Sequence, residues 1–430
     1  MSVSPDAVSP PRRSLLDRLG PRWAVLLLGA AVVLAILSTV RLITDSQALT
    51  SSGTAAAALR LAVPIGLAGL GGLYSERAGV VNIGLEGMMI LGTWFGGWAG
   101  FEFGVWWGVA FGVLGGALGG LLHSIATVNF GVDHIVSGVA INILAAGVTR
   151  FLSVVVLTDL PGGGATQSPS VTGDIGSASV PVLAGGDIFG WRSPDVLGAI
   201  EDSGVFFFAD LAGLLRGVLG GLSWLAVIAL ALVPFTWWFL WRTPIGLRLR
   251  SVGENPYAAE SLGVRVYTMK HLGVIVSGAL AGLGGVFLVV ESAGIYKEGQ
   301  TAGRGFIGLA AMIFGNWKPT GTAMGAGVFG FADALQLRSN DAVHGLLLFI
   351  ALLAALGVFG FLIRRRLTPA GIMALMGGGF LLWFLQTDSV PNEFIAMTPY
   401  VVTLLVLAFA TQRLRMPAAD GLQYRKGESG

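Results

Sequence analysis

The 430-residue chain contains no cysteine and only four histidines. Without cysteine it can form no disulfide, no thiolate nucleophile and no cysteine-ligated metal site. The sequence also lacks the phosphate-binding pattern G-x-x-x-x-G-K-[ST], the zinc-binding pattern H-E-x-x-H and a serine nucleophile elbow. These absences argue against an enzyme and against a chain that binds ATP through a phosphate-binding loop of its own.

Charge is scarce as well, because Asp, Glu, Lys and Arg together make up 12% of the chain while hydrophobic residues make up 54%. Soluble domains carry roughly 25% charged residues. Apolar runs of about 20 residues recur along the chain, which is long enough to cross the hydrocarbon layer as helices. No alternating pattern of the kind found in membrane β-barrels repeats. The sequence therefore predicts an all-α membrane protein, a polytopic helical bundle of about twelve spans.

The distribution of basic residues predicts the orientation of this bundle, since Lys and Arg favour the cytoplasmic side. Residues 1–22 carry four arginines and are expected to form a cytoplasmic tail. The long segment 159–219 is rich in Asp and Glu and poor in Arg, so we expect it to be an external loop. It is either a docking surface for an external protein or a tolerated insertion. Counting spans from these points places both termini in the cytoplasm.

Three polar residues within the apolar runs are candidates for a polar pathway: Asn82, Glu86 and Asn142. Asn82 and Glu86 are four residues apart, so in one helix over 79–100 they would share a face. A carboxylate inside a membrane is costly unless it is paired or hydrated, which favours a functional role for Glu86. The alternative is a hydrogen bond that holds two packed helices together, and the sequence leaves both readings open.

The stretch 243–267 is unusually polar and lies between two long apolar runs, 222–241 and 272–290. Gly253 is predicted to end one short helix, and Asn255 and Pro256 to begin another, because proline suits the first helical turn. Gly263 is predicted to end this second helix. A short helix between two membrane spans can serve as a lever for a soluble partner. The alternative is an ordinary charged loop.

Two motifs give the sequence a resemblance to a known family. The first is Thr-x-x-Gly, then Gly-x-Asn-x-x-Ala-Ala and Gly-Val, in the stretch 243–264, and the second is the core Asn-Ile-Gly-Leu-Glu-Gly at 82–87. In this order and at this separation they resemble the permease subunits of bacterial ABC importers, in the branch for simple sugars and nucleosides. The second motif resembles the nucleoside type. The resemblance covers about residues 60–337 and 391–417.

The resemblance implies a permease subunit that forms the pathway for nucleosides and has no ATPase site of its own. A separate ATP-binding subunit, which holds ATP and Mg²⁺, would dock on 243–267, here called the coupling loop. We expect this contact at Gly253, Glu254, Asn255, Ala258, Ala259 and Gly263. Other expected partners are a second permease subunit, an external substrate-binding protein and the lipid of the bacterial plasma (inner) membrane. No nucleic acid, cofactor or metal is expected in this chain.

The chain departs from the family near its C-terminus, where extra residues include two apolar runs divided by Arg364, Arg365 and Arg366. We therefore expect a core transmembrane domain (23–338), an inserted transmembrane hairpin (339–390), a last core span (391–412) and a cytoplasmic tail (413–430). The core would have the ABC importer permease fold. The hairpin is expected at the periphery of the bundle.

Other functions remain open at this point. A permease for a simple sugar such as ribose or galactose fits the same branch of the family. An ion-coupled secondary transporter would use Glu86 and Glu291 as its ion-linked acids and the short segment 303–316 as a broken helix. An intramembrane enzyme fits least, because no set of residues forms a nucleophile and base.

Overall fold

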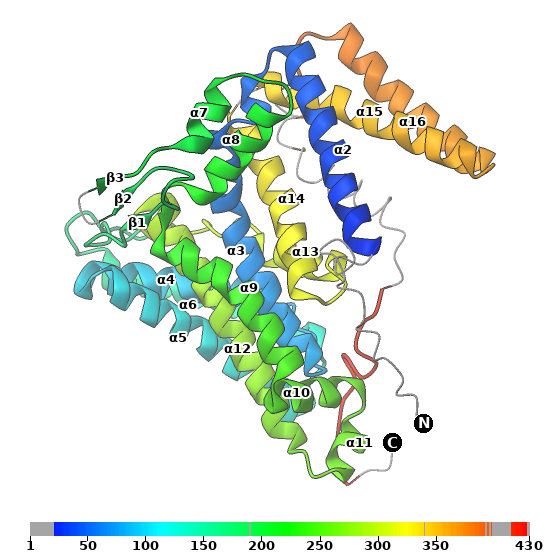
Figure 1. The fold of residues 1–430 in the computed structure, drawn as a ribbon. Helices are drawn as coiled ribbons and strands as arrows, with labels where there is room; N and C mark the ends of the chain where they lie inside the picture. Colours follow the sequence, from blue (N-terminus) through cyan, green and yellow to red (C-terminus); the bar gives the residue numbers. More distant parts are fainter. Residues whose placement is uncertain are drawn as a thin grey trace, which may run out of the picture.

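The computed structural model describes residues 21–188, 191–338, 340–391, 394, 397 and 414–427, which form an almost entirely helical protein (Figure 1). Eight helical segments in these ranges are long and apolar enough to cross a membrane. The predicted all-α, polytopic membrane class is therefore confirmed. The strands within the same ranges are two residues long and pair antiparallel, β1 with β4 and β2 with β3.

The long helices match most of the predicted apolar runs. In chain order they are α2 (Pro21–Thr44), α3 (Ser52–Arg77), α4 (Leu85–Phe103), α5 (Val105–Ser124), α6 (His134–Leu152), α9 (Trp224–Arg242), α12 (Val266–Phe287), α14 (Pro319–Arg338), α15 (Asn340–Ile363) and α16 (Leu367–Gln386). Two of them begin after a serine whose hydroxyl accepts a backbone N–H, Ser51 before α3 and Ser223 before α9. Such N-caps satisfy donors that the first turn leaves free.

Short elements connect the long helices. They are η1 (Gln47–Leu49), η2 (Ile125–Asn129), η3 (Ser153–Leu157), β1 (Ser177–Ala178), β2 (Asp187–Ile188), β3 (Trp191–Arg192), α7 (Val196–Asp202), α8 (Phe208–Leu219), β4 (Leu222–Ser223), α10 (Pro244–Glu254), α11 (Pro256–Ser261), η4 (Leu288–Ala293) and α13 (Arg304–Phe314). Helices α10 and α11 lie at one end of the bundle, whereas α7, α8 and the strands lie toward the opposite end (Figure 1).

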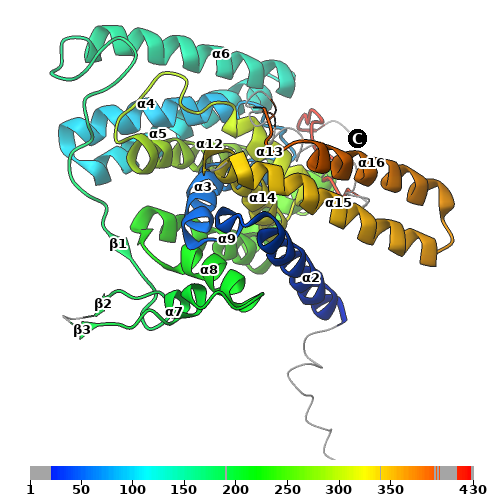
Figure 2. The same ribbon diagram turned by 90° about the horizontal axis from the view of Figure 1, so that it is seen from above.

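Helices α3 and α12 lie at the centre of the bundle. Figure 2 shows α6 outermost on one side, then α4 and α5, then α12, then α3 with α14, and α8 and α9 beyond them. Helix α12 packs directly on α3, α4 and α5. A movement of α3 or α12 is therefore passed to most of the bundle.

Small residues allow α5 and α12 to approach each other closely. Gly112, Gly116 and Gly120 of α5 face Gly278 and Gly282 of α12. A Cβ atom at Gly116 would lie 2.3 Å from the carbonyl oxygen of Gly278, which is too close for any other residue. This stripe of glycines therefore lets the two helices pack backbone against backbone, as small residues do in many membrane proteins.

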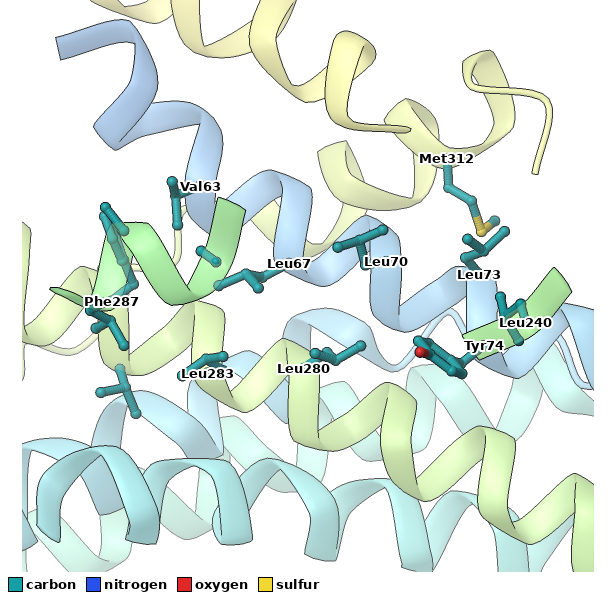
Figure 3. Close-up of a cluster of buried hydrophobic side chains, with 14 of the residues drawn as sticks. Val63, Leu67, Leu70, Leu73, Tyr74, Leu240, Leu280, Leu283, Phe287 and Met312 are labelled. Carbon is teal, nitrogen blue, oxygen red and sulfur yellow. The ribbon is translucent and has the colours of Figure 1, made fainter. Parts of the chain in front are cut away.

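The largest hydrophobic core lies between α3, α9, α12 and α13 (Figure 3). Leu70 and Leu73 of α3 face Met312 of α13, and Leu283 and Phe287 of α12 line the same core. These side chains are almost completely buried. Since protein interiors are close-packed, this core couples the four helices mechanically.

The predicted external loop contains an ordered unit made of α7 and α8. Arg216 of α8 donates to Asp195, which caps the start of α7, at 2.9 Å and to Glu201 within α7 at 3.0 Å. On its other face α8 buries Asp210 3.0 Å from Arg41 of α2. Helix α8 thus packs on α2 and α3.

The C-terminal region contains a helical hairpin, α15 and α16, which projects from the side of the bundle (Figures 1 and 2). Its helices pack on each other, and α15 also packs on α2. Arg364, Arg365 and Arg366 form the turn between the two helices. The predicted last span, 391–412, and residues 1–20 of the N-terminal tail lie almost entirely outside the described residues.

Candidate functional site

Two short helices form the coupling loop, as predicted. The hydroxyl of Thr243 accepts the N–H of Gly246 at the start of α10, and the Oδ1 atom of Asn255 accepts the N–H of Ala258 at the start of α11. Proline follows each cap in the first turn. Gly263, with φ +81°, lies just beyond α11 in the left-handed conformation that glycine adopts without strain.

The predicted contact residues divide into an exposed set and a buried set. Glu254, Asn255, Ala258 and Gly263 are exposed. Ala259 points inward and packs with Val252 and Val266. Leu262 was not among the predicted contacts, yet this residue is 84% exposed. An exposed apolar side chain on a short helix is the kind of group that a partner protein can take up in an apolar groove.

Gly253 differs from its prediction, because α10 continues through it to Glu254 instead of ending there. Gly253 is buried against the end of α3, and a Cβ atom there would lie 2.3 Å from the carbonyl oxygen of Arg77. The residue is therefore a glycine because two backbones touch, and not because the helix must stop. This makes Gly253 the point where the coupling loop rests on the core.

Arg77, at the end of α3, connects the coupling loop to three other parts of the core. Its guanidinium lies 3.7 Å from Glu254 and donates to the carbonyl oxygen of Trp317 at 2.7 Å. It also lies over the ring of Trp241 at the end of α9, 5.5 Å from the ring centre, and Arg250 of α10 lies over the same ring. One side chain thus joins α3, α9, α10 and the turn between α13 and α14.

The C-terminal segment 414–424 forms a strap across this end of the bundle. The N–H of Ala419 donates to the carbonyl oxygen of Gly253 at 2.9 Å, and the N–H of Ala418 donates to Glu254 at 3.3 Å. The ring of Tyr424 packs on Tyr257 of α11 and on Tyr267 of α12. The strap therefore holds α11 against the start of α12.

Asp420 of the strap is buried beside Glu76 of α3 and Lys270 of α12. Burial and the neighbouring Glu76 carboxyl raise the pKa of Asp420 far above its usual range, because both disfavour the charged form. Lys270 donates to the carbonyl oxygens of Gly79 and Leu422 at 3.2 and 3.4 Å. Titratable groups thus meet where the strap, α3 and α12 join.

The prediction that Asn82 and Glu86 share a helix face is wrong, because α4 begins only at Leu85. Asn82 lies in the non-helical segment before it, where its Oδ1 atom accepts the N–H of Gly84 at 3.0 Å. Asparagine favours such local turns over helix interiors. Its amide donates to Ser277 of α12 at 2.9 Å, so it ties this segment to the bundle centre.

Glu86 and Asn142 each bind the backbone of a neighbouring element. The carboxylate of Glu86 accepts the N–H groups of Gly303 and Gly305 at 2.9 and 2.7 Å, at the start of the short helix α13. A carboxylate is favoured there by free backbone donors and by the helix dipole. Asn142 bridges α6 to the start of α4, accepting from Gly87 and donating to Ile83. The helix-packing alternative therefore describes their observed contacts, and contact with a solute stays a prediction.

Sequence reasoning missed three parts of this region: Leu262, Arg77 as a hub, and the strap. One feature of the sequence could have indicated the exposure of Leu262, because this apolar residue directly follows the polar last turn of a helix in a charged loop. The strap had none, because its contacts join residues far apart in the chain.

Long apolar helices joined to an exposed pair of short helices place the protein in the class of polytopic helical membrane proteins. The chain belongs to the family described as the branched-chain amino acid transport system permease component, which matches residues 54–356. This makes it an integral membrane protein and a subunit of a transport system. A permease subunit of this kind is not an enzyme by itself.

Several ABC transporter permeases are similar to this chain over most of its length. It is 34% identical to the guanosine ABC transporter permease protein NupQ of Bacillus subtilis, over 86% of this chain and 96% of that protein. It is 33% identical to the nucleoside ABC transporter permease protein NupC of Lactococcus lactis, over 85% and 94%. It is 30% identical to the putative glucose ABC transporter permease protein TsgC13 of Haloferax volcanii, over 86% and 96%. No solved structure matches the chain.

Proposed function

We propose that this protein is the permease subunit of a nucleoside ABC importer in a bacterial plasma membrane, driven through α11 by a separate ATPase subunit. The observation that carries the proposal is the exposed α11, which is attached to the two central helices of the bundle. The guanosine and nucleoside permeases among its relatives support the substrate class.

The contacts suggest how a push on α11 reaches the pathway. A partner that presses on Ala258 and Leu262 moves α11 together with α10, because only Asn255 separates them. Helix α10 transmits this movement to α3 at Gly253 and Arg77. Helix α3 shares its core with α9, α12 and α13, so the displacement spreads as a rigid-body movement instead of a local distortion.

The proposal includes the remaining partners and the orientation. The ATPase subunit holds ATP and Mg²⁺, a second permease subunit completes the pathway, and an external binding protein delivers the solute. The coupling loop and both termini are cytoplasmic, and the unit of α7 and α8 is external. The long helices, α13 and the last apolar run together make about twelve spans. The positions of Arg and Lys support this orientation, and so does the location of the coupling loop and of the α7 and α8 unit toward opposite ends of the bundle in Figure 1.

Asn82, Glu86 and Asn142 enter the proposal as residues that hold the walls of the pathway. Glu86 anchors the start of α13, which is shorter than the other apolar helices counted as spans. Irregular backbone at membrane depth is tolerated where it lines a cavity. Loss of any of the three contacts would free a segment whose backbone then lacks a partner.

A simple-sugar permease is the second candidate function, because one relative is a putative glucose permease. The test is uptake by the complete importer, with ATPase and binding protein, of radiolabelled uridine, ribose, glucose and leucine. ATP-dependent uptake of uridine alone supports the proposal. Uptake of a sugar or of leucine without uridine would overturn the nucleoside assignment.

The coupling part of the proposal is tested by changing the size of one exposed side chain. Ala258→Arg places a long charged group on the outer face of α11, and Ala258→Ser is the matched small control. We expect the arginine variant to lose about tenfold or more of its uptake, as expected when a buried interface residue clashes. Equal uptake by both variants would contradict docking at α11.

A further inference from the structure

Most charged groups in the membrane-spanning helices have a clear partner. Arg41 of α2 pairs with Asp210 at 3.0 Å, and Glu86 of α4 accepts two backbone N–H groups. Arg150 of α6 forms an ion pair with Glu298. This is expected, because an unpaired charge at membrane depth is expensive unless it faces water.

Arg60 and Glu291 are exceptions, since neither side chain has an ion pair or hydrogen bond within the described part of the chain. Arg60 is an exposed residue of α3, about 12 Å along the helix from Ser52. Glu291 is a half-buried residue of η4, which continues α12. The two residues are distant in sequence and lie on the two central helices of the bundle.

Both side chains line the same cavity, which has a volume of about 220 Å³. It lies where α3 and η4 meet the end of α8 and the start of α9. Asp174, Ser177 and Ser223 contribute further polar groups, and glycines leave backbone exposed along the wall. Two intramembrane charges without partners therefore converge on one mostly polar space at the end of the bundle opposite the coupling loop.

The chemistry of the lining selects among solutes. Arg60 and the two serines donate hydrogen bonds, while Asp174 and Glu291 accept them. One positive and two negative groups disfavour an anion such as a nucleotide. None of the described residues that line the cavity is aromatic, so among them a base finds no ring to stack on. A vicinal diol, which both donates and accepts, fits these groups.

We propose that the cavity between Arg60 and Glu291 is a solute-binding site that recognises the ribose hydroxyls of an uncharged nucleoside and does not distinguish one base from another. The proposal rests on the proposed function, because it assumes that the solute enters from this end of the bundle. It predicts a pathway that accepts nucleosides with different bases and rejects those that lack the 2′ and 3′ hydroxyls.

The natural absence of cysteine makes the site directly testable. Ser223→Cys places one thiol in the cavity, and Ser203→Cys, between α7 and α8, is an exposed control outside it. The complete importer in proteoliposomes is labelled with a membrane-impermeant maleimide, with and without uridine or 2′,3′-dideoxyuridine. We expect uridine to slow labelling of Ser223→Cys only, and the dideoxy compound to protect at about tenfold higher concentration or not at all.

A second pair of variants tests the charged groups. Arg60→Gln and Glu291→Gln should each lower uridine uptake about tenfold with the complex assembled and ATP hydrolysis retained, because each removes a charge-assisted hydrogen bond to the solute. Asp202→Asn changes a charge on α7 outside the cavity and is the control. Wild-type uptake by both glutamine variants would overturn the proposal.

The two assays separate the site from the proposed function. If uridine is transported but protects neither thiol, the cavity does not bind the solute and the inference fails. If the importer transports ribose but no nucleoside, and ribose slows labelling of Ser223→Cys, the cavity stands and the nucleoside assignment fails.

Discussion

The guanidinium of Arg77 lies 3.7 Å from the carboxylate of Glu254, linking the end of α3 to the junction of α10 and α11. Glu254 is 55% exposed, and ion pairs with such exposure contribute little. The same guanidinium also binds the carbonyl oxygen of Trp317 and lies over the ring of Trp241. Arg77 therefore acts mainly through its other contacts, and Glu254 is the weaker partner.

This difference gives the first prediction. Glu254→Gln should lower uptake per ATP hydrolysed by no more than about twofold, since it removes an exposed ion pair worth up to about 1 kcal/mol. Arg77→Ala should lower it about tenfold or more, because a charged hydrogen bond and an aromatic contact are lost together. The measurement is uptake divided by ATP hydrolysis in proteoliposomes. Similar losses in both variants would contradict the assignment of Arg77 as the hub.

The second prediction concerns the contact between Gly253 and α3. Gly253→Ala forces a Cβ atom against the carbonyl oxygen of Arg77, so α10 must move away from the core. We expect reduced transport and a loss of stability of about 1–3 kcal/mol, as for other overpacked sites. Gly327→Ala of α14 is the control, because a Cβ atom there meets nothing within 4 Å. Thermal unfolding in detergent compares the two, and equal midpoints would argue against a tight contact.

The third prediction concerns the strap. Tyr424→Ala removes the ring that packs on Tyr257 and Tyr267. The centroid of the Tyr424 ring lies 5.2 Å from that of Tyr257 and 5.5 Å from that of Tyr267. Each such pair contributes about 0.5–1.5 kcal/mol. We therefore expect faster proteolysis of the C-terminal segment and lower uptake per ATP, and Tyr424→Phe should behave like the unchanged protein. A strap that stays protected in the alanine variant would show that the ring does not hold it.

The fourth prediction concerns pH. The pKa of Asp420 is raised above the value of about 3.9 for an unfolded chain, so docking of the strap favours the protonated carboxyl. This stabilisation is complete at low pH and is lost as the pH rises through the raised pKa. Glu76, Lys270 and Arg77 are the charged groups that face Asp420.

We therefore expect the amide of Ala419, which donates to Gly253, to exchange hydrogen faster relative to an unfolded reference as the pH is raised from about 6 to about 9. Asp420→Asn removes the titrating group and should flatten this dependence. Hydrogen exchange measured by mass spectrometry on both proteins is the test. Protection that rises with pH would have the wrong sign.

The sequence predicted those features that depend on neighbours along the chain. Apolar runs marked the helices because a span must satisfy its own backbone, and Asn255 and Gly263 marked the limits of α11 because caps are local. Asn82 was misplaced because its side chain competes with the helix for backbone donors. This competition is visible only once the Gly84 contact is seen.

Features that join distant segments could not be predicted. The burial of Gly253 depends on Arg77, and the convergence of Arg60 and Glu291 depends on how α3 and α12 pack. Glu86 was recognised as a costly intramembrane charge, yet its partner, the start of α13, lies more than two hundred residues away. Neither periodicity nor spacing contains this information.

The central claim is that a soluble ATPase subunit docks on α11, and cross-linking tests this contact most directly. Leu262→Cys provides a single thiol at the most exposed apolar residue of the coupling loop, and Ser203→Cys provides one at the opposite end of the bundle. With a short thiol-to-amine cross-linker, we predict a covalent product between the Leu262→Cys protein and the ATPase subunit, with a yield that changes when ATP binds. No product from Leu262→Cys, or an equal product from Ser203→Cys, would contradict the account.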